Sequence, residues 1–124
     1  MKGDSIMSFI RGKKKSLKEM LEDAGYVKLD KATMDPKEGI EIDGVEKGES
    51  AENGTFVYVS GLYKGSMVYV AVPTASVDDF KDITAEDLEE IRNDKLKMFV
   101  EKRTSKGNPP RDYFIAYIDD QPAE

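Results

Sequence analysis

The clearest pattern in the chain is a pair of alternating segments at residues 55–60 and 66–72. Successive side chains of a β-strand point to opposite faces, so the pattern predicts a hairpin with one aliphatic face and one aromatic face. The turn is expected over Gly61–Gly65, and Pro73 ends the second strand. One face carries Val57, Val59, Val68, Val70 and Val72, and the other carries Phe56, Tyr58, Met67 and Tyr69.

Two helices are predicted where capping residues precede apolar positions at helical spacing. Ser16 and Glu19 form a capping box for the first helix, which Gly25 ends. Thr84 and Asp87 start the second helix, which ends near residue 94. The apolar positions are Leu17, Met20, Leu21 and Ala24 in the first helix, and Leu88 and Ile91 in the second.

The remaining segments predict three weaker strands and two loops. Residues 40–45 alternate and indicate a strand, whereas residues 46–54 are acidic and predict a solvated loop. Residues 74–83 predict a loop anchored by Val77, Phe80 and Ile83. Residues 96–103 have a period of two, and Tyr113–Ile118 forms a last strand after the loop Ser105–Asp112. The expected core comprises Val57, Val59, Val68, Val70, Val72, Leu96, Met98, Val100 and Ile115, with Leu88 and Ile91 at one end.

Composition narrows the function classes. The 124 residues suffice for one domain, and 39% of them are hydrophobic. The chain has no Cys and no His, so it lacks thiolate ligands and the usual general base near neutral pH. No nucleophile, phosphate-binding or dinucleotide-binding motif is present. We therefore expect a protein that is not an enzyme and uses no cofactor or metal.

Location is inferred from the same composition. No apolar run approaches the ~20 residues that a membrane helix needs, and residues 1–15 have no apolar core typical of a signal peptide. We expect no membrane partner and a cytoplasmic protein.

Charge is unevenly distributed along the chain. The net charge is −6, yet Lys95–Arg111 holds six basic side chains against Glu101 alone, a local balance of +5. Phosphate binding depends on such local clusters rather than on the total charge. A second basic run, Arg11–Lys15, precedes the first helix, and residues 119–124 form an acidic tail.

The element order resembles that of the OB-fold, a five-stranded Greek-key barrel whose second and third strands bind oligonucleotides. The expected fold is mainly β with two helices: a five-stranded OB-like barrel over residues 38–118, with a helix between strands 3 and 4. Residues 1–37 add a basic segment and an N-terminal helix, and residues 119–124 form the tail of this single domain. The two strands with the aromatic face, residues 55–60 and 66–72, would be strands 2 and 3.

Among OB-folds, the chain resembles small single-stranded-DNA-binding proteins, including phage-encoded ones. The resemblance implies non-specific binding of single-stranded DNA or RNA by base stacking and phosphate contacts. It also implies replication or repair partners for the acidic tail, although this tail lacks a terminal hydrophobic residue and the chain lacks Trp. The predicted nucleic-acid-binding residues are Phe56, Tyr58, Lys64, Tyr69, Lys97, Phe99, Arg103, Lys106 and Arg111.

Three alternatives stay open on the sequence. The aromatic face could instead pack under the N-terminal helix, through Phe9, Ile10, Leu17, Met20 and Leu21. The acidic clusters would equally suit a protein-binding module, such as a small phage or mobile-element inhibitor. Two-faced strands also suit a structural assembly subunit, which would be a homo-oligomer.

Overall fold

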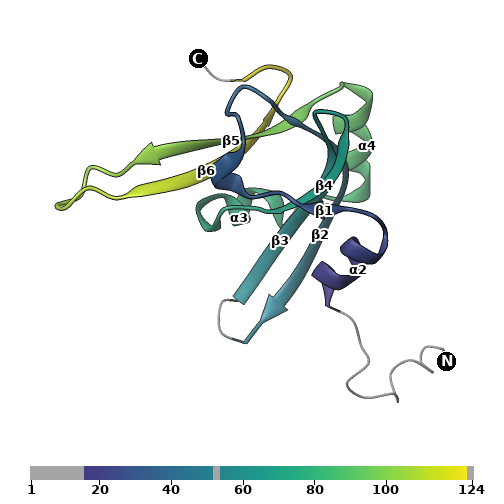
Figure 1. Cartoon of the computed structure of the whole chain (residues 1–124), viewed down its shortest axis with the longest axis horizontal. Coiled ribbons are helices and arrows are strands. Elements are labelled where there is room, and N and C mark those ends of the chain that lie inside the picture. The colour runs from purple at the N-terminus through teal and green to yellow at the C-terminus, as the bar shows by residue number, and fades with distance from the viewer. Residues whose placement is uncertain (1–15, 52–53, 123–124) are drawn as a thin grey trace.

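A six-stranded sheet, curled into a half-barrel, forms the body of the protein in this computed structural model (Figure 1). The structure describes residues 16–51 and 54–122. The strand order is β1-β4-β3-β2-β5-β6. None of the helices in these ranges is long and apolar enough to cross a membrane. The strands are β1 (Val27–Lys28), β2 (Ile40–Ser50), β3 (Gly54–Tyr63), β4 (Ser66–Ala71), β5 (Lys97–Thr104) and β6 (Asp112–Asp119).

The prediction of a solvated loop over residues 46–54 is wrong for residues 46–50. These residues continue β2, which pairs with β3 in antiparallel register from Glu41 opposite Leu62 to Ser50 opposite Gly54. Pairing with β3 provides hydrogen-bond partners for the backbone N–H and C=O groups of this polar segment. The segment can therefore form a strand with few apolar side chains. The result is a β2–β3 hairpin that extends beyond the core (Figure 1).

An irregularity in β2 explains its broken alternation. The register with β3 shifts between Ile42 and Gly44, which leaves Asp43 as an extra residue. Ile42 is buried before the shift, and Val45 packs against the same core after it. A strict period of two would have placed these two side chains on opposite faces.

The β3–β4 turn is shorter than the predicted turn over Gly61–Gly65. β3 continues to Tyr63, whose side chain is buried, and β4 starts at Ser66. Only Lys64 and Gly65 remain, with φ of 51° and 83°. Positive φ at both central residues is typical of the two-residue hairpin turn that matches the twist of paired strands.

Three helices are described, where the sequence predicted two. Both predicted capping boxes are present, at α2 (Leu17–Asp23) and α4 (Ala85–Asn93). The third helix lies in the predicted loop 74–83, where η2 (Thr74–Ser76) leads into α3 (Val77–Phe80). Phe80 is 2% exposed, so it anchors this segment to the core as the sequence predicted.

The sheet has one strand more than the five predicted. Val27 and Lys28 pair in parallel with Val68 and Tyr69 of β4, which places β1 at the sheet edge. After β1 the chain passes through η1 (Lys31–Thr33), and Met34 enters the core. A two-residue strand carries too little alternation to be found from sequence.

The core lies inside the curl of the sheet and includes the predicted valines of β3 and β4 with Met98 and Val100 of β5. Ile115 was predicted there wrongly: Ala116 is buried, and Phe114 and Ile118 pack against the core. The η2–α3 segment lies against β6, where the buried Ser76 hydroxyl accepts a hydrogen bond from the Ala116 N–H at 2.8 Å. This contact occupies part of the outer edge of β6.

Candidate functional site

The aromatic face of the β3–β4 hairpin lies under α2. Tyr69 is 1% exposed, and its hydroxyl donates a 2.6 Å hydrogen bond to a Glu22 carboxylate oxygen of α2. Burial, and then the hydrogen bond to Glu22, raise the pKa of Tyr69 to about 12. A base cannot stack on Tyr69 in this arrangement, because the ring is not accessible.

Phe56 and Tyr58 extend the same aromatic row along β3. The Phe56 and Tyr58 ring centroids are 5.6 Å apart, and those of Tyr58 and Tyr69 are 5.7 Å apart, both in edge-on geometry. A Cβ built on Gly48 would lie 2.6 Å from the Phe56 ring and 3.2 Å from Leu17 of α2. The Phe56 ring and the α2 side chain therefore meet over Gly48, where a side chain would not fit.

Phe99, a further predicted stacking residue, is also buried. Its ring stacks on Tyr117 of the neighbouring strand at 5.6 Å and an interplanar angle of 25°. The backbone at Gly39 also lies close to this ring, since a Cβ there would be 2.9 Å from the Phe99 ring. Phe99 is thus a packing residue at 2% exposure.

The predicted cations do not form one stripe. Lys64 is exposed on the β3–β4 turn, and Lys97 is half-buried at the start of β5. Arg103 is paired with Glu101 at 2.7 Å. Only Arg103, Lys106 and Arg111 lie together, towards the tip of the β5–β6 hairpin, which projects from the body as a two-stranded arm (Figure 1).

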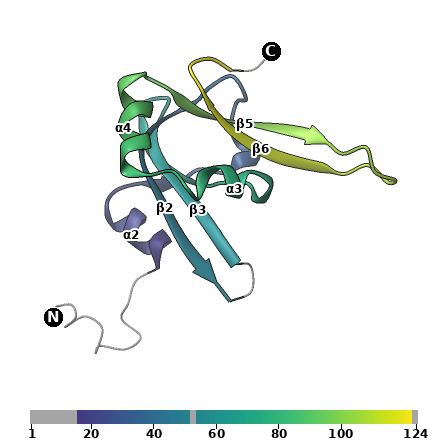
Figure 2. The ribbon, with the colours of Figure 1, turned by 180° about the vertical axis from the view of Figure 1, so that it is seen from behind.

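A groove of about 830 Å³ lies between this arm and the β2–β3 hairpin, and we call it the hairpin groove. Figures 1 and 2 show the two hairpins diverging from the body with α3 between them. Phe56, Tyr113 and Phe114 are among the residues that line the groove, together with Lys31 and Lys81. The Phe56 ring lies over Gly48 on the α2 face, and Phe114 packs against the core, so Tyr113 is the ring that the groove offers. Tyr113 is 40% exposed, so its ring is open to a ligand.

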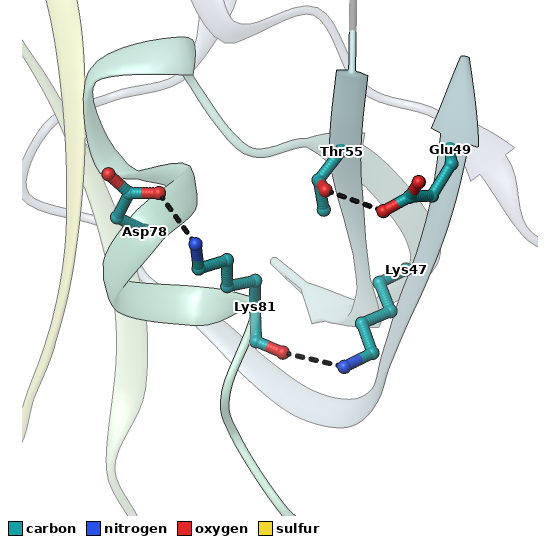
Figure 3. A network of polar contacts seen from close by, with 5 residues as sticks. All are labelled: Lys47, Glu49, Thr55, Asp78 and Lys81. Carbon is teal, nitrogen blue, oxygen red and sulfur yellow. Dashed lines mark hydrogen bonds and ion pairs between the residues drawn. The ribbon is translucent and has the colours of Figure 1, made fainter. Parts of the chain in front are cut away.

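Polar contacts hold one wall of the hairpin groove in place (Figure 3). The Lys47 ammonium of β2 donates to the Lys81 carbonyl oxygen at 3.2 Å, at the C-terminal end of α3. The Lys81 ammonium pairs with Asp78 at 3.1 Å, and the hydrogen bond to Asp78 raises the pKa of Lys81. The Thr55 hydroxyl donates to Glu49 at 2.9 Å across the hairpin. These contacts connect β2, β3 and α3 into one wall.

Sequence reasoning identified one residue of the hairpin groove, Phe56, and missed the others. Tyr113 and Phe114 belong to a strand that is apolar on both faces. Because a sheet needs only one apolar face for its core, the second apolar face was the sequence feature that could have indicated them as site residues. Lys31 and Lys81 are isolated cations in segments without periodicity, so only the tertiary structure reveals them. The predicted basic run Arg11–Lys15, and Phe9, Ile10, Ala123 and Glu124, lie outside the described residues.

The hairpin groove offers the exposed Tyr113 ring and the side chains of Lys31 and Lys81 to a ligand. Within residues 16–51 and 54–122, no three acidic side chains converge in a way that could hold a metal ion. Comparison with protein-family models, with curated proteins and with solved structures finds no match to this chain.

Proposed function

We propose that this protein binds single-stranded nucleic acid, DNA or RNA, without sequence preference in the hairpin groove. The observation that carries the proposal is the placement of the exposed Tyr113 with Lys31 and Lys81 in one groove between two hairpins. Aromatic rings stack on any base, and ammonium groups attract the phosphate backbone. The groove volume of about 830 Å³ also lies within the range of known ligand sites.

The element order supports the same proposal. Strands β2 to β6, with α4 between β4 and β5, follow the order expected of an OB-like barrel. In OB-folds, the loops between strands 1 and 2 and between strands 4 and 5 flank the oligonucleotide site. The corresponding connections here are the tips of the β2–β3 hairpin and of the β5–β6 arm. Lys106 and Arg111 at the arm tip would then contact phosphates entering the groove.

The test is fluorescence anisotropy of labelled oligo-dT and oligo-U with the full chain at about 50 and 200 mM salt. We expect affinity that falls steeply with salt. Tyr113→Ala should weaken binding by about 1–3 kcal/mol, or 5- to 150-fold, the contribution of one stacked base. The matched control is Met67→Ala, because Met67 is similarly exposed at 41% and lies outside the groove.

A second variant tests the phosphate contacts separately. Lys106→Gln with Arg111→Gln should reduce the salt dependence by about 0.7 per cation removed, as expected for single strands. Absence of binding at the lower salt, or equal affinity of the Tyr113→Ala variant and the parent protein, would contradict the proposal.

A further inference from the structure

The outer edge of β6 borders the hairpin groove, and the hydrogen bonds around it show which backbone groups point outward. The Ala116 N–H points away from β5, because it donates to the Ser76 hydroxyl of η2 at 2.8 Å. Just beyond β5, the Ser105 N–H donates to the Arg111 carbonyl oxygen at 2.8 Å, so these two residues bond to each other across the arm. Bonded and non-bonded pairs alternate along an antiparallel ladder, and both observations fit the same alternation.

This alternation fixes the direction of the Phe114 backbone. Phe114 lies two residues before Ala116 and opposite Lys102, so its N–H and C=O also point away from β5. β6 is the outermost strand of the sheet. Among residues 16–51 and 54–122, no strand, loop or side chain bonds to the Phe114 N–H or C=O on that side. One backbone donor and one backbone acceptor are therefore unpaired at this position.

The unpaired Phe114 groups belong to the wall of the hairpin groove. Phe114 lines the groove, as do Thr74 and Ala75 of η2. Ser76, also in η2, accepts the next outward N–H along β6, so the groove borders the same side of the strand. The exposed ring of Tyr113 is the neighbouring residue. A backbone donor and acceptor in such a groove need partners from a ligand or from water.

We propose that the Phe114 N–H and C=O form hydrogen bonds with the Watson–Crick edge of a base in the bound single strand. The inference rests on the proposed function and adds a base contact to the stacking and the phosphate contacts. Every base carries a donor beside an acceptor on this edge: N6–H and N1 in adenine, N4–H and N3 in cytosine, N1–H and O6 in guanine, and N3–H and O4 in thymine or uracil. One N–H with one C=O can therefore pair with any base, which keeps binding independent of sequence.

The open part of the edge is too short for an added peptide strand. The outward N–H of Ala116 is already bonded to Ser76, and β6 begins at Asp112. Only Asp112 and Phe114 offer outward groups between these two points, whereas a typical strand has about 5–6 residues. A base needs only one donor and one acceptor, so it fits this edge better than a peptide does.

The first test compares Phe114→Pro with Phe114→Ala in fluorescence anisotropy of labelled oligo-dT with the full chain. Both variants lose the ring that packs against the core, but only proline also removes the N–H. Proline is tolerated on an edge strand where the N–H faces away from the neighbouring strand. We expect Phe114→Pro to bind about 2- to 13-fold more weakly than Phe114→Ala, the range of one hydrogen bond, and the same ratio with oligo-dC.

A second test leaves the protein unchanged, so its result does not depend on how the variants fold. Oligo-dT made of N3-methylthymidine keeps the phosphates and the stacking ring but loses the N3–H donor. The parent protein should bind it about 2- to 13-fold more weakly than oligo-dT.

The outcomes separate this inference from the proposed function. Equal affinity of the parent protein for the two oligonucleotides, or equal affinity of two folded Phe114 variants for oligo-dT, overturns the base contact. If Tyr113→Ala still weakens binding in that case, the proposed function stands without it. Absence of oligo-dT binding at the lower salt overturns both.

Discussion

Tyr69 and Tyr113 are the same residue type on two strands of one sheet, and their environments are opposite. Tyr69 is 1% exposed under α2, with its hydroxyl bonded to Glu22. Tyr113 is 40% exposed on the β5–β6 arm and lines the hairpin groove. Alternation thus decides which face of the sheet a ring occupies, whereas a covering element decides whether the ring is buried or open to solvent.

The largest expected effect is the difference in stability between the two tyrosine-to-alanine variants. Tyr69→Ala removes a buried ring and should lower the free energy of unfolding by about 3–5 kcal/mol. Tyr113→Ala, at an exposed site, should change it by less than about 1 kcal/mol. Urea denaturation monitored by circular dichroism measures both. If both variants lost the same free energy of unfolding, the two tyrosines would not differ in burial as described.

A smaller effect is expected where α2 meets the covered face. Gly48→Ala places a Cβ within 2.6 Å of the Phe56 ring and 3.2 Å of Leu17. We expect a loss of about 1–3 kcal/mol, typical of overpacking, as α2 is displaced from the sheet. Gly107→Ala is the control, because its nearest atoms would be 3.6 Å away. Hydrogen exchange of the α2 amides should accelerate in Gly48→Ala alone, and unchanged exchange would contradict the proposed packing.

The smallest effect concerns the Tyr69 hydroxyl. Tyr69→Phe removes one hydrogen bond to a charged group, and because Glu22 remains exposed we expect a loss of about 1 kcal/mol. The raised pKa adds a pH signature. Folding favours the protonated phenol, so its stabilisation is complete below pH 10.0, the ordinary pKa, and is lost as pH rises through about 12.

Other groups also titrate at high pH. Comparison of Tyr69→Phe with the parent protein isolates the contribution of the Tyr69 hydroxyl to the pH dependence of stability. The difference in unfolding free energy between them should shrink from pH 10.0 towards about 12. A difference that is constant over this window would mean that folding does not raise the pKa of Tyr69.

The sequence predicted the helices and the central hairpin well because their signals are local. Both capping boxes, the two faces of β3 and β4 and the valine core are confirmed. The pairing of residues 46–50 with β3 and the pairing of β1 with β4 were both missed, for one reason. Their strand conformation is stabilised by the backbone pairing partner rather than by their own side chains.

The candidate site was predicted less completely than the fold. Phe56 lies in the hairpin groove, and Lys106 and Arg111 lie at the arm tip beyond it. Tyr69 and Phe99 are buried, and Lys97 is half-buried at the start of β5, away from the hairpin groove. Alternation identified the ring-bearing face correctly, but the contact between α2 and that face spans 47 residues from Glu22 to Tyr69. A pattern read over a few neighbouring residues carries no information about such a contact.

By itself, the sequence determined the faces of β3 and β4, the starts of α2 and α4, and the absence of cysteine and histidine chemistry. These properties depend on neighbours a few residues apart, through alternation, capping and composition. Only the tertiary structure decided which rings are covered, where the hairpin groove lies and which cations line it. Those properties depend on segments far apart in the chain, which the curl of the sheet brings into contact.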